Sequence, residues 1–169
     1  MSTKANFTPE EWAHVAGSPM VAGIAITAAE PSGIWGLLKE SMAGGWAVLE
    51  AQHDESANPL VKAVADDIAD PATRDAIKNA FQERFKGSTL PDAKAKAESE
   101  LQAVAEILDQ KAPDDAPAFK RWLLTVAQKT AEASTEGGFL GIGGVAVSDA
   151  EKTTLDEIAN ILGLGHVTA

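Results

Sequence analysis

Residues 132–163 read EASTEGGFLGIGGVAVSDAEKTTLDEIANILG, and they hold the glycine-rich segment of the chain and its clearest helix. Ser148 and Glu151 have the spacing of a capping box, in which a hydroxyl and a carboxylate each satisfy a backbone amide at a helix start. Apolar residues then recur at helical spacing up to Leu162. Gly163 follows, and glycine suits the left-handed conformation that often ends a helix. The stretch therefore predicts a glycine-rich loop followed by a closing α-helix.

The glycine-rich loop spans Gly137–Val147. Its central pair, Gly143-Gly144, lies between apolar runs, and two-residue hairpin turns need residues that accept positive φ. The loop lacks the Gly-Lys-Ser/Thr of a phosphate-binding loop and the spacing of a dinucleotide-binding loop. We therefore expect a short hairpin-like loop whose apolar side chains cover the core or contact a partner. The candidate partner-binding residues are Phe139, Leu140, Ile142 and Val145.

The composition favours an all-α protein with one core. The chain has 169 residues, no Cys and a formal net charge of −11. This charge repels nucleic acid and anionic membrane surfaces, so neither is an expected partner. The absence of Cys excludes disulfides and thiolate metal sites. No signal-peptide pattern and no apolar run of about 18 residues occurs, so we expect a cytoplasmic protein without membrane insertion.

Helix start and stop signals predict a single-domain helical bundle of about seven helices. We expect one domain over residues 8–163, with flexible tails at residues 1–7 and 164–169. Gly17-Ser18-Pro19 is expected to break the first helix, and Met20–Ala29, which is nearly without charge, is expected to lie in the centre of the core. Other expected features are helix starts at Thr8-Pro9, Asn58-Pro59 and Asp70-Pro71, a helix over Ile34–Gln52 with Leu49 on its apolar stripe, a turn at Gly87-Ser88-Thr89 and a longer helix over Pro91–Lys111.

The last part of the chain resembles a known family. Ser148-Asp149-Ala150-Glu151-Lys152, followed by Ile161-Leu162-Gly163, is similar to the final helix of the tellurite-resistance TerB-like helical family. In that family an acidic turn precedes a Ser/Glu-capped helix that ends in Leu-Gly. Glu30 and Glu132 stand at the two places of this chain that would correspond to such turns. The resemblance implies an all-α fold, metal binding at the acidic turns and a role in stress-response or membrane-associated assemblies.

Acidic residues around the glycine-rich loop form a candidate cation site. Oxygen ligands suit hard cations such as Ca²⁺ or Mg²⁺, although the spacing here is not that of an EF-hand. Two of these residues also stand in the first turn of the predicted closing helix, where negative charge is stabilised by the helix dipole. The candidate metal ligands are Glu132, Glu136, Asp149 and Glu151.

No catalytic constellation is evident in the sequence. His14, His53 and His166 are scattered without a metal-binding spacing, and no serine-nucleophile motif occurs. The leading hypothesis is therefore a non-catalytic, acidic interaction or accessory module, without a cofactor, that binds a protein partner or self-associates. The alternative is a helical module that binds Ca²⁺ or Mg²⁺, and the third hypothesis is an enzyme of unknown type.

Overall fold

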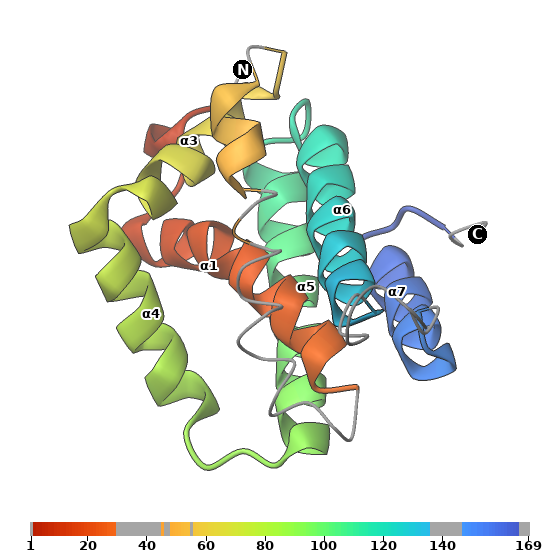
Figure 1. The fold of residues 1–169 in the computed structure, drawn as a ribbon. Helices are drawn as coiled ribbons and strands as arrows, with labels where there is room; N and C mark the ends of the chain where they lie inside the picture. Colours follow the sequence, from red (N-terminus) through yellow and green to blue (C-terminus); the bar gives the residue numbers. More distant parts are fainter. Residues whose placement is uncertain (1, 30–44, 46–47, 55, 136–146, 166–169) are drawn as a thin grey trace.

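Helices dominate the computed structural model, which describes residues 2–29, 45, 48–54, 56–135 and 147–165 (Figure 1). These residues contain no strand, and most of their buried apolar side chains join in one core cluster, so the predicted all-α bundle is confirmed for them. The predicted hairpin-like turn lies outside the described residues. The named elements are η1 (Lys4–Asn6), α1 (Pro9–Thr27), α3 (Pro59–Ala69), α4 (Pro71–Phe85), α5 (Leu90–Lys111), α6 (Ala116–Thr135) and α7 (Asp149–Ile161).

The helix α1 is the centre of the bundle. It crosses α5 and α6 and packs mainly against these two helices (Figure 1). After Glu11 it contains no Asp, Glu, Lys or Arg, and buried residues run along its length from Trp12 to Thr27. A helix that is apolar on most sides is typical of a core position. The predicted central place of Met20–Ala29 is therefore confirmed for the buried residues Val21, Ala22, Ala25 and Ile26, whereas Met20 is partly exposed.

The predicted helix break at Gly17-Ser18-Pro19 is wrong, because α1 continues through Pro19. A proline inside a helix has no N–H to donate to the carbonyl four residues earlier, which here belongs to Val15. The buried Ser18 hydroxyl donates to this Val15 carbonyl at 2.7 Å. The side chain next to the proline thus satisfies the acceptor that the proline leaves open, and the helix can continue.

The predicted caps of α7 are confirmed at both ends. The Ser148 amide donates to Glu151 Oε2 at 2.9 Å, and the Glu151 amide donates to Ser148 Oγ at 3.1 Å. At the other end, Gly163 has φ 72° and donates to the Asn160 carbonyl at 3.0 Å, and Leu164 donates to the Ala159 carbonyl. These two bonds form a Schellman motif. Other side-chain N-caps are Thr8, Asn58, Asp70 and Thr89.

Residues 2–7, which were expected to form a flexible tail, lie against the helices. Phe7 is buried, and its ring centroid lies 5.5 Å from that of Trp12. The Ser2 amide donates to Asp115 at 2.5 Å, and Asn58 Nδ2 donates to the same carboxylate at 2.8 Å. Burial alone would raise the pKa of Asp115, but the hydrogen bonds from Ser2 and Asn58 outweigh it and lower the pKa. This carboxylate joins the start of the chain to the starts of α3 and α6.

Only part of the predicted Ile34–Gln52 helix lies in the described residues. Residues 48–53 are helical, with Val48 and Ala51 buried. Leu49, which is expected on the apolar stripe of this helix, is 48% exposed, so the stripe is not buried at this position.

Candidate functional site

The predicted partner-binding residues Phe139, Leu140, Ile142 and Val145 lie outside the described residues. Their proposed role therefore stays a prediction. Val147, at the end of the same loop, is described, and it packs half-buried against the core cluster.

The described members of the predicted cation site have different surroundings. Asp149 is fully exposed and pairs with Lys152 at 3.3 Å, one turn along α7. Glu151 is buried, and its carboxylate accepts the Ser148 amide of the capping box. Glu132 is exposed near the end of α6, and Glu136 lies outside the described residues. Within the described ranges, no three Asp, Glu, His or Cys side chains are grouped so that they could hold a metal ion.

The helix α4 has a distinct position at the edge of the bundle. None of its side chains is fully buried. Its apolar stripe is half-buried, with Ile77 and Phe81 facing α1 and the Phe81 and Phe85 rings stacked at a centroid distance of 4.4 Å. α3 and α1 are its main neighbours, and Figure 1 shows α4 diverging from α1 towards its C-terminal end. Two cavities lie beside this part of α4, and Ile77 and Phe81 line both of them together with residues of α1.

The larger cavity, of about 550 Å³, lies between α1 and α4, and we call it the α1–α4 groove. Its volume falls within the range of about 300–1,000 Å³ typical of small-molecule sites. Most of its lining is apolar, and the charged side chains in the described lining are Arg74 and Lys78. The main apolar lining residues are Met20, Ile24, Val48, Ile68, Ile77 and Phe81.

The smaller cavity, of about 330 Å³, differs in its polar groups, which already have partners. Asp67 accepts from Lys4 Nζ at 2.7 Å and from the Trp12 indole N–H at 2.7 Å. Lys4 Nζ also lies 5.5 Å from the centroid of the Trp12 ring. The polar groups of the smaller cavity therefore hold residues 2–7 against the helices.

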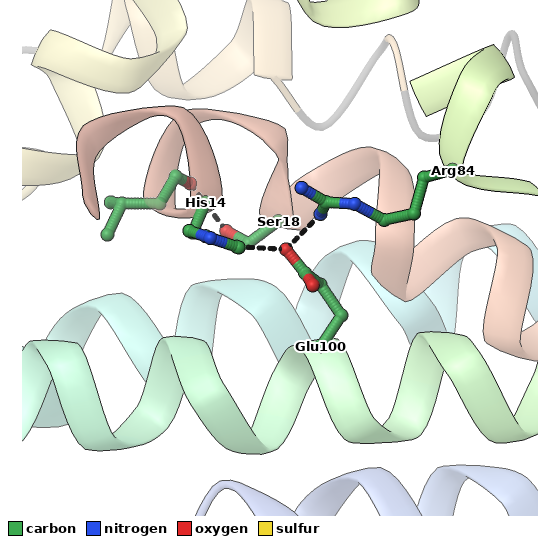
Figure 2. A network of polar contacts seen from close by, with 5 residues as sticks. His14, Ser18, Arg84 and Glu100 are labelled. Atoms are coloured by element: carbon green, nitrogen blue, oxygen red, sulfur yellow. Dashed lines mark hydrogen bonds and ion pairs between the residues drawn. The ribbon is translucent and has the colours of Figure 1, made fainter. Parts of the chain in front are cut away.

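A polar network ties the end of α4 to the centre of the bundle (Figure 2). One carboxylate oxygen of Glu100, on α5, contacts both His14 of α1 and Arg84 of α4. Nearby, Lys96 Nζ donates to Ser88 Oγ at 2.8 Å and to the Arg84 carbonyl at 3.3 Å. The sequence around His14 gives no signal of this contact, because Arg84 and Glu100 are far from His14 in the chain.

The same network does not form a nucleophilic triad. Ser18 lies one turn from His14 on α1, and Figure 2 shows both side chains near Glu100. However, Ser18 is fully buried and its hydroxyl donates to the Val15 carbonyl. A serine nucleophile needs its hydroxyl directed at a general base and accessible to substrate. The role of Ser18 is therefore to support the helix at Pro19.

No family model, no curated protein and no solved structure matches this chain. The TerB-like resemblance therefore stays a prediction from the sequence. Among the helices that the structure describes, none is both long enough and apolar enough to cross a membrane.

Proposed function

We propose that this protein is a non-catalytic binding module that holds the apolar part of a ligand in the α1–α4 groove. The observation that carries the proposal is the cavity of about 550 Å³ with mostly apolar lining, placed under a helix that buries none of its side chains fully. Apolar cavities of this size with a few polar groups at the edge are the usual form of ligand sites. The predicted partner-binding residues of the glycine-rich loop, Phe139, Leu140, Ile142 and Val145, remain a second proposed contact surface, for a protein partner.

The exposure of the side chains at the groove supports ligand binding rather than simple packing of α4 on α1. Side chains of α4 that face α1 are half-exposed, so they keep apolar surface that a ligand can remove from water. Met20 of α1, at the groove, is 36% exposed. Each square ångström of apolar surface covered by a ligand contributes roughly 25 cal/mol to binding before the costs of association. The accessory or interaction role predicted from the sequence thus has a definite candidate surface.

A neutral fluorescent probe tests this proposal. We expect N-phenyl-1-naphthylamine to bind the full chain saturably with a stoichiometry near one, because it is apolar and uncharged. Met20→Trp, which places a larger side chain at the groove, should weaken binding by at least about tenfold. Leu90→Trp is a matched control, because Leu90 is also 36% exposed but lines neither cavity.

Two results would contradict the proposal. One is the absence of saturable probe binding to the folded protein. The other is an equal loss of binding in Met20→Trp and Leu90→Trp, since the probe would then respond to a general change and not to the groove. Circular dichroism of each variant confirms that the helices are intact.

A further inference from the structure

We propose that the ligand of the α1–α4 groove is a free, single-chain amphiphile with an anionic head group, such as a long-chain carboxylate. The acyl chain lies along the apolar lining, and Arg74 and Lys78 bind the head group. This inference rests on the proposed function, because it assumes that the groove binds a ligand, and it adds the chemical class of that ligand.

The first argument is the sign of the charge at the groove. The chain has 25 Asp and Glu against 14 Lys and Arg, yet the described lining of the groove contains two cations and no carboxylate. Arg74 and Lys78 are four residues apart, so they lie one turn apart on the same side of α4. A cationic edge in an otherwise acidic protein is complementary to one anionic group on a ligand.

The second argument is that these two cations have no strong competitor within the described part of the chain. Neither Arg74 nor Lys78 belongs to any ion pair found there. Asp70 lies near enough for Arg74 to help lower the pKa of its carboxyl group. The larger cause of that lowering is a hydrogen bond from the Thr73 amide at 2.8 Å, which caps α4. By contrast, Arg84, on the same helix, is bound to Glu100.

The third argument concerns the body of the ligand. Ala16, Ile77 and Phe81 line both cavities, so the groove and the smaller cavity share apolar residues in their walls. A single acyl chain is much narrower than an α-helix, which with its side chains is about 10–12 Å across, and it matches a lining that is mostly apolar. A single acyl chain also brings no backbone polar groups that would need hydrogen-bond partners in an apolar lining. The groove thus favours a small amphiphile over a peptide segment.

Displacement of the neutral probe by three twelve-carbon compounds tests the head group. Dodecanoate, dodecanol and dodecyltrimethylammonium share one chain and differ in charge, and each is used below its micelle concentration. We expect dodecanoate to bind at least tenfold more tightly than dodecyltrimethylammonium. Arg74→Gln with Lys78→Gln should weaken the binding of dodecanoate by at least about tenfold, because its head group loses charge-assisted hydrogen bonds, and should leave the binding of dodecanol within about twofold.

A second double variant controls for the total charge. Arg121→Gln with Lys152→Gln also removes one Arg and one Lys, and neither residue lines either of the two described cavities. We expect it to change the affinity for dodecanoate by less than about twofold. An equal loss in both double variants would overturn the inference, because the effect would then come from the overall charge.

The failures of the two proposals are distinguishable. If the probe binds in the groove but the three compounds displace it equally, the anionic class is overturned and the binding function stands. If the probe does not bind at all, both fail. Sedimentation of the protein with phosphatidylglycerol vesicles that dodecanoate does not reverse would also overturn the inference, because the ligand would then be a membrane surface.

A photo-crosslinking residue identifies any other occupant. With p-benzoylphenylalanine in place of Met20 in the full chain, we expect irradiation to give a covalent adduct of the mass of dodecanoate. A crosslink within the chain, or to a second copy, that persists at saturating dodecanoate would overturn the inference. The groove would then be covered by the protein itself.

Discussion

The helices α5 and α4 show how similar sequence signals lead to different structural roles. Both begin at a side-chain cap with a proline in the first turn, and both have an apolar stripe at helical spacing. In α5 the stripe is buried, because α1, α6 and α7 all pack against this helix. In α4 no side chain is fully buried, because its neighbours α3 and α1 leave part of the stripe uncovered. The periodicity of a helix therefore predicts which face turns inward but not how completely it is covered.

The largest expected loss of stability follows from a substitution in the buried apolar stripe of α5. Leu101 is fully buried, and Leu101→Ala should lower the free energy of unfolding by about 2–5 kcal/mol, because it leaves a cavity in the core. Chemical denaturation measures this change. The control is Leu90→Ala on the same helix, where a partly exposed side chain should cost less than about 1 kcal/mol. Equal losses would contradict the described difference in burial.

A second prediction concerns α1, which packs against both α4 and α5. Ser18→Ala should cost about 1–3 kcal/mol of unfolding free energy, because the buried Val15 carbonyl loses its donor. In a Pro19→Ala background, the backbone amide of residue 19 can donate to Val15, so the same Ser18→Ala change should cost less than about 1 kcal/mol. The double-mutant cycle measures this coupling directly. Additive effects would mean that Ser18 does not compensate for the proline.

An intermediate loss of stability is expected from a substitution in the half-buried apolar stripe of α4. Phe81→Ala removes a large but only half-buried ring, so we expect a loss of about 1–2 kcal/mol in place of the 3–5 kcal/mol of a fully buried Phe. Phe119→Ala is the control, because it removes the same side chain from a fully buried position in the core. If Phe81→Ala costs as much as Phe119→Ala, α4 is an integral part of the core and the contrast with α5 fails.

The smallest effect is expected at the polar attachment of α4. Partly exposed ion pairs contribute about 0.2–1 kcal/mol, so Arg84→Gln should raise amide exchange rates in α4 by no more than about fivefold. Exchange in α5 should not change, because this helix is held by its buried side chains. Lys86→Gln is the control, since the partner of Lys86 among the described residues is the exposed Glu83, three residues away. A uniform change in α4 and α5 would show that the two helices open together.

Local signals in the sequence predicted much of the fold and little of the candidate site. The caps at Thr8 and Ser148 were predictable, because each depends on residues three positions apart. The continuation of α1 through Pro19 was missed, because the rule that proline breaks a helix omits the rescue by a neighbouring hydroxyl. The α1–α4 groove depends on the angle at which two distant helices meet, and no residue spacing within either helix encodes that angle.

The Ser18–Pro19 pair sets an expected order for substitutions during evolutionary drift. A chain that loses the Ser18 hydroxyl first passes through a form in which a buried carbonyl has no donor. A chain that loses Pro19 first regains a backbone donor, and the residue at position 18 is then free to change. Related sequences that keep proline at this position are therefore expected to keep a small hydroxyl residue before it, whereas those without the proline are expected to vary there.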